Sequence, residues 1–124
     1  MAKIAHLMAG GLSAAESARV VGGNFSEGNY TAAGSTKATA TLLNSVSSYV
    51  SICSSSGKGV ELMQMDQGDS MEVYNGGANT LYVYSNGSDT IINHSANQGF
   101  AVNTLKGCQF RKVTSSVVMV NLSN

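Results

Sequence analysis

Residues 71–84 read MEVYNGGANTLYVY, and this stretch carries the pattern that decides the predicted fold. Apolar and polar residues alternate on both sides of the NGGA segment at 75–78, as they do in half-buried β-strands. Asn and Gly tolerate the positive φ of a tight turn, so the segment predicts a hairpin. On that hairpin Tyr74, Tyr82 and Tyr84 would share one face, which suits contact with a protein or a carbohydrate. The alternative is a half-buried ladder of cross-strand pairs.

Short runs of the same kind extend outward from this stretch over residues 41–124, each bounded by Gly, Asn, Asp or Ser. Residues 41–52 are predicted to supply the first strand, and Asn86-Gly87 gives a second hairpin signal. Seven or eight short strands at this spacing predict an antiparallel β-sandwich or barrel, in a chain that is mainly β. We find no internal sequence repeat that would predict a solenoid.

Residues 1–23 form the only segment with a helical period, and we call them the arm. The segment SAAE at 13–16 has the form of a capping box, and Gly22-Gly23 supplies a C-terminal stop. Helices this short are marginal alone in water, so the arm is expected either to fold back on the chain or to dock on a partner. Residues 24–40 have the Gly-, Ser- and Thr-rich composition of a linker between the arm and a β domain at 41–124.

Composition limits the class of protein. The chain has 124 residues, with seven Lys or Arg and seven Asp or Glu, so its net charge is zero. This argues against a nucleic-acid partner and against a polybasic membrane-surface protein, and no apolar run reaches the ~20 residues of a membrane span. So few charges suit a protein that packs against other protein, and the alternative is an ordinary β protein with a Ser- and Asn-rich surface.

The two cysteines, Cys53 and Cys108, do not make a disulfide framework and are expected to be small, half-buried strand residues. Residues 1–23 lack the compact apolar stretch of a signal peptide. The chain is therefore expected to be made and folded in a reducing cytoplasm.

The search for catalytic and metal-binding patterns gives little. His94 lies in a polar loop near Asp89, and such a pair could orient a base, but a polar turn is the favoured interpretation. Asp66 and Asp69 flank a glycine and could hold a Ca²⁺ ion, but they lack the further ligands of a calcium loop and predict a plain turn. The sequence thus predicts no enzyme, no cofactor and no metal site.

Five segments together resemble one class of proteins, the structural proteins of tailed-phage virions. Residues 7–22 resemble their short helical N-terminal module, and 32–43 resemble the AAG-containing lead-in to their β domain. The GKGVEL strand at 57–62, the hairpin-like 73–84 and the segment 92–100 follow in the same order as in that class.

The resemblance implies a non-enzymatic virion protein, made in the host cytoplasm and located on the capsid surface. Its implied role is that of a capsid decoration (cement) protein, a homotrimer that binds the major capsid protein and stabilises junctions between shell subunits. The alternative is a receptor- or glycan-binding module of a tail or head fibre, whose partner would be a host glycan. In the first case the arm would contact the capsid through its apolar residues Ile4, Leu7, Met8, Leu12 and Val21.

Overall fold

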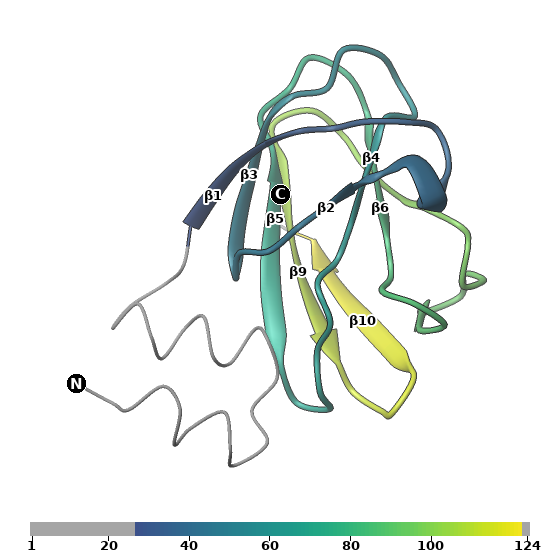
Figure 1. The fold of residues 1–124 in the computed structure, drawn as a ribbon. Coiled ribbons are helices and arrows are strands. Elements are labelled where there is room, and N and C mark those ends of the chain that lie inside the picture. Colours follow the sequence, from purple (N-terminus) through teal and green to yellow (C-terminus); the bar gives the residue numbers. More distant parts are fainter. Residues whose placement is uncertain (1–26, 123–124) are drawn as a thin grey trace.

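The computed structural model describes residues 27–122, which form two β-sheets (Figure 1). These residues contain one short 3-10 helix, η1 (Lys37–Thr39), and no α-helix. The six-stranded sheet contains, in spatial order, β1 (Glu27–Thr31), β3 (Ser47–Ile52), β5 (Ser70–Asn75), β9 (Lys106–Lys112), β10 (Val117–Leu122) and β7 (Thr90–Ile91). The four-stranded sheet contains β2 (Thr41–Leu42), β4 (Gly59–Glu61), β6 (Leu81–Tyr84) and β8 (Phe100–Val102).

The first six strands alternate between the two sheets, so the chain winds as a coil. In the six-stranded sheet β1 pairs in parallel with β3, and β3 pairs in parallel with β5. In the other sheet β2, β4 and β6 are also parallel. Each coil thus stacks on the next, which makes the arrangement β-solenoid-like.

Two of the later strands, β8 and β9, run in the opposite direction to the earlier strands of their sheets. β8 pairs antiparallel with β6, and β9 pairs antiparallel with β5. β10 pairs antiparallel with β9 and parallel with β7. Both sheets are therefore mixed, because each contains parallel and antiparallel pairs of strands.

The prediction of a mainly β fold is confirmed, but the antiparallel sandwich or barrel is wrong. The predicted hairpin at 75–78 is a corner, because β5 and β6 belong to different sheets (Figure 1). Asn75 is fully buried there, and its Nδ2 donates to the carbonyl oxygens of Asn79 and Val102, both at 2.9 Å. Its Oδ1 accepts a hydrogen bond from the Gly77 amide at 2.9 Å. The Asn75 side chain thus forms hydrogen bonds with backbone groups of the corner, where a hairpin would have hydrogen bonds between its two strands.

The second predicted hairpin is likewise a turn between sheets. Gly87 has φ +56°, and the Asp89 amide donates to the Asn86 carbonyl oxygen at 3.0 Å. The turn joins β6 to β7, which lies at the far edge of the six-stranded sheet. The predicted first strand at 41–52 is also divided, into β2 and β3, by a corner at which Val46 is buried.

The described part of the predicted linker, residues 27–40, belongs to the β fold, so that prediction is wrong for these residues. β1 is paired with β3 along its length. Ala32 is buried, and Ala33 exchanges two backbone hydrogen bonds with Gly59, at 3.0 and 3.1 Å. Small residues suggested a linker because they contribute little to a core. In the structure they allow the backbones of neighbouring coils to approach closely.

The core lies between the two sheets. From the six-stranded sheet Val50, Met71 and Phe110 point inward with no exposed surface, and from the other sheet Val60 and Val83 do the same. Strand residues alternate between faces, so the residues between these face outward. The two sheets therefore cover each other's apolar faces.

The arm predicted at 1–23, with Ile4, Leu7, Met8, Leu12 and Val21, lies outside the described residues. Among residues 27–122 there is no helix with the length and apolar character needed to span a membrane.

Candidate functional site

The outer face of the six-stranded sheet carries a row of residues in register across four strands. Asn29 of β1 lies opposite Tyr49 of β3, which lies opposite Tyr74 of β5, and Tyr74 lies opposite Gly107 of β9. The rings of Tyr49 and Tyr74 are stacked, with centroids 5.6 Å apart and an angle of 16° between their planes. Both rings are exposed, Tyr49 by 44% and Tyr74 by 41%.

Gly107 is important in this row because it has no side chain. One face of the Tyr74 ring stacks on Tyr49, and the strand on its other side contributes only the glycine. No side chain of β9 therefore stands beside Tyr74 in this row.

A second row lies next to the first and is polar. Ser47 of β3 lies opposite Glu72 of β5, Glu72 opposite Gln109 of β9, and Gln109 opposite Asn121 of β10. Within the described residues, the side chains of these four residues make no hydrogen bond or ion pair with one another or with other residues. Their hydroxyl, carboxylate and amide groups therefore face solvent.

The two rows border two adjoining hollows, which together we call the trough. One hollow, of about 450 Å³, lies over β3, β5, β9 and β10, and the other, of about 480 Å³, lies over β1, β3 and β5. They share Ser47, Ser48 and Tyr74. Volumes of this size are in the range of sites for small ligands. The residues lining the first hollow are Ser47, Ser48, Glu72, Val73, Tyr74, Gly107, Cys108, Gln109, Asn121 and Leu122.

The predicted face of Tyr74, Tyr82 and Tyr84 is not formed. Tyr82 and Tyr84 lie on β6 in the other sheet, and Tyr84 is 3% exposed. The Tyr84 hydroxyl donates to the Ser35 carbonyl oxygen at 3.4 Å, and burial raises the pKa of this side chain. Tyr74 keeps its predicted exposure, but its partner is Tyr49, which the sequence reasoning missed. The sequence gives one indication of this pairing: Tyr49 lies in the strand of the coil that precedes the coil of Tyr74.

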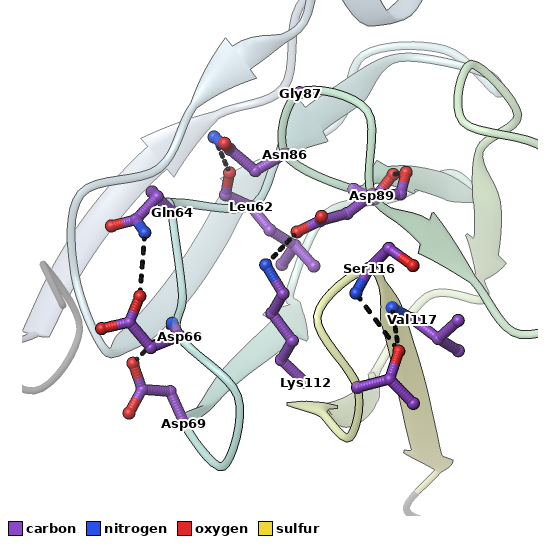
Figure 2. A network of polar contacts seen from close by, with 12 residues as sticks. Leu62, Gln64, Asp66, Asp69, Asn86, Gly87, Asp89, Lys112, Ser116 and Val117 are labelled. Carbon is purple, nitrogen blue, oxygen red and sulfur yellow. Dashed lines mark hydrogen bonds and ion pairs between the residues drawn. The ribbon is translucent and has the colours of Figure 1, made fainter.

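His94 and Asp89 have other partners in the structure. The Asp89 carboxylate forms an ion pair with Lys112, with Nζ and Oδ2 2.9 Å apart (Figure 2). The His94 Nδ1 atom is 2.9 Å from the Ile92 carbonyl oxygen, and its ring contacts Phe100. Both side chains therefore have structural partners, and no triad-like arrangement of an acid and a base is formed between them.

Asp66 and Asp69 form the predicted turn. The Asp66 amide donates to Asp69 Oδ2 at 2.9 Å (Figure 2). The Asp69 amide donates to the Asp66 carbonyl oxygen at 3.0 Å. Gly68 between them has φ +97°, and its amide donates to the Lys112 carbonyl oxygen at 2.7 Å. The turn thus fastens the start of β5 to the end of β9. Residues 27–122 contain no group of three or more His, Cys, Asp or Glu side chains placed to hold a metal ion.

The two cysteines are free thiols, and both are buried, whereas the sequence predicted half-buried strand residues. Cys53 follows the end of β3 and lies outside the strands. Cys108 lies on β9, and burial raises its pKa to about 11. Burial also raises the pKa of Cys53, with a smaller opposing effect of Lys58. A thiol is a nucleophile only when it is ionised, so these positions favour structural cysteines over reactive ones.

Comparison with known proteins gives no match: no protein-family model, no curated protein and no solved structure is similar to the chain at a level that indicates relatedness.

Proposed function

We propose that the protein is a non-enzymatic structural protein of a tailed-phage virion, a capsid decoration protein whose arm binds the shell while the β body projects from it. In this proposal the apolar residues Ile4, Leu7, Met8, Leu12 and Val21 contact the major capsid protein. The assignment to a virion is supported by the sequence resemblance of five segments in the same order.

One structural observation carries the proposed division between arm and body: the two sheets cover each other's inner faces. The inward side chains of β3, β5 and β9 pack against those of β4 and β6, so the body has an apolar core between its own sheets. The chain enters this body at β1, an edge strand of the six-stranded sheet. A segment joined at the edge can extend to a neighbouring subunit without opening the core.

The proposed partner arrangement is a homotrimer that presents three arms to the shell. Three weak contacts on one assembly bind with an avidity far above that of a single arm, because the second and third contacts form at high effective concentration. Sedimentation equilibrium of the free protein tests the trimer, and a monomer at micromolar concentration would contradict it.

The test of the proposed function has two measurements. Quantitative mass spectrometry of purified particles should give an amount of this protein near that of the major capsid protein. The full chain with Leu7→Asp and Met8→Asp should then fail to co-sediment with undecorated shells, while Ser17→Asp in the same segment binds normally.

Two outcomes contradict the proposal. Absence of the protein from particles removes the virion assignment. A large fall in the unfolding midpoint of the Leu7→Asp, Met8→Asp chain would show that the arm is part of the body's own fold and not a free anchor.

The second candidate function is a receptor- or glycan-binding module of a fibre. The trough favours it, because exposed aromatic rings beside hydroxyl, amide and carboxylate side chains suit the binding of a sugar. A trace amount per particle, in place of near parity, would support this second candidate.

A further inference from the structure

We propose that the trough binds a neutral carbohydrate chain, with a sugar ring placed against the open face of Tyr74. This inference is argued from residues 27–122 and goes beyond the attachment of the arm to the shell. It deepens the second candidate function, on which it rests, by naming the binding site and the class of sugar.

The first argument is the ring of Tyr74. Its one face is stacked on Tyr49, which fixes the ring, and on its other side the register partner is Gly107. A pyranose ring has an apolar face of C–H groups that fits against an aromatic ring. The polar hydroxyl of the tyrosine can stay in water while its ring contacts the sugar. The fixed ring loses little conformational freedom when the sugar binds, which favours affinity.

The second argument is the polar row beside the ring. Ser47, Glu72, Gln109 and Asn121 occupy the same register level on four neighbouring strands, which are spaced about 4.8 Å apart. They offer a hydroxyl, a carboxylate and two amides, and so supply both donors and acceptors. Sugar hydroxyls also donate and accept, so several hydroxyls along a chain can bond to such a row at the same time.

The third argument is charge and size. Among the described residues that line the two hollows, Glu72 has the only charged side chain, and it is negative. A carboxylate without a cationic neighbour in the lining repels phosphate and sialic acid groups, which favours neutral sugars. A hollow of about 450 Å³ has room for a small ligand of one or two rings.

The experiment applies the labelled full chain to a printed array of neutral oligosaccharides, with sialylated and phosphorylated oligosaccharides on the same array. We expect binding to one or more neutral glycans and little to the acidic ones. Tyr74→Ala should weaken that binding at least about tenfold, whereas Tyr74→Phe should keep it because the ring remains. Arg111→Ala, an exposed change on the same sheet outside the lining, is the matched control and should bind as the unchanged chain does.

A second measurement does not depend on whether a variant folds. In nuclear magnetic resonance spectra of the unchanged chain, the bound glycan should shift the amide signals of Gly107 and Gln109. The signal of Ala101, on the four-stranded sheet, should stay in place.

Three results would overturn the proposal: no binding to any neutral glycan, binding confined to acidic glycans, or binding unaffected by Tyr74→Ala in a folded chain. Failure here is distinct from failure of the shell proposal. The Leu7→Asp, Met8→Asp chain should lose shell binding and keep glycan binding, and Tyr74→Ala should do the reverse.

Discussion

Replacing Asn75 by Ala is the sharpest test of the coiled fold, because this one side chain holds the corner between β5 and β6. Asn75 is fully buried, and it makes three hydrogen bonds of 2.9 Å to backbone groups of Asn79, Val102 and Gly77. In Asn75→Ala those three backbone groups lose their partner at once. Each buried polar group left unsatisfied costs about 1–3 kcal/mol.

The bond to Asn79 is partly exposed, so water can replace it at lower cost than the other two. We therefore expect Asn75→Ala to lower the free energy of unfolding by about 3–6 kcal/mol. The whole folding free energy of a domain is about 5–15 kcal/mol, so the variant should be close to unfolding. The assay is urea unfolding followed by circular dichroism, with the midpoint and the slope both fitted.

The control is Asn79→Ala, on the same corner. The Asn79 side chain makes one hydrogen bond, from Nδ2 to the Cys53 carbonyl oxygen at 2.8 Å. Its loss should cost about 1 kcal/mol. If Asn75→Ala and Asn79→Ala have equal, small effects, the corner is held by the backbone alone and the reasoning is refuted.

Two further predictions concern Lys112 and Cys108. The side chains of Lys112 and Asp89 are only 11% and 15% exposed, so Lys112→Met should lower the free energy of unfolding by about 3 kcal/mol. The double variant Lys112→Met, Asp89→Asn should cost less than the two single changes together, and strictly additive values would show that the pair is not coupled. Burial raises the Cys108 pKa from 9.0 to about 11, so the unfolded chain releases this proton first as the pH rises. The thiol's contribution to stability should be present below pH 9 and lost towards pH 11. The difference in thermal midpoint between the unchanged chain and Cys108→Ala should therefore become smaller over that range. A constant difference would contradict this prediction.

The strands of this protein were predictable because their faces differ. In β5 the alternation of buried Met71 and Val73 with exposed Glu72 and Tyr74 is the pattern expected of a half-covered sheet. The same holds for β9. Local periodicity therefore gave the secondary structure and the exposure of Tyr74.

The topology was not predictable from these runs. An Asn-Gly turn signal is the same for a hairpin and for a corner, and at 75–78 the choice depends on the carbonyl oxygen of Val102, far along the chain. The coils are also unequal, since Asn29 lies opposite Tyr49 and Tyr49 opposite Tyr74. Coils of different length leave no fixed sequence period, so the repeat is visible in space but not in the sequence.

The Ser- and Asn-rich composition also has a structural explanation that the sequence alone did not give. Ser48 donates to the Ser45 carbonyl oxygen at 3.1 Å, and Asn86 donates to that of Leu62 at 3.0 Å. Such side chains satisfy backbone groups where the chain turns from sheet to sheet. Some of the Ser and Asn residues that suggested a neutral surface therefore have a structural role at the corners between the sheets.

The position of β9 affects how the protein can be made. This strand lies between β5 and β10 inside the six-stranded sheet, and it supplies the fully buried Phe110. Synthesis delivers the coils of β1 to β6 first, when one edge of β5 is still without its neighbouring strand. The body can close only after β9 has left the ribosome. A chain that ends before Lys106 should therefore be degraded by proteases or aggregate. It should not form a smaller folded body.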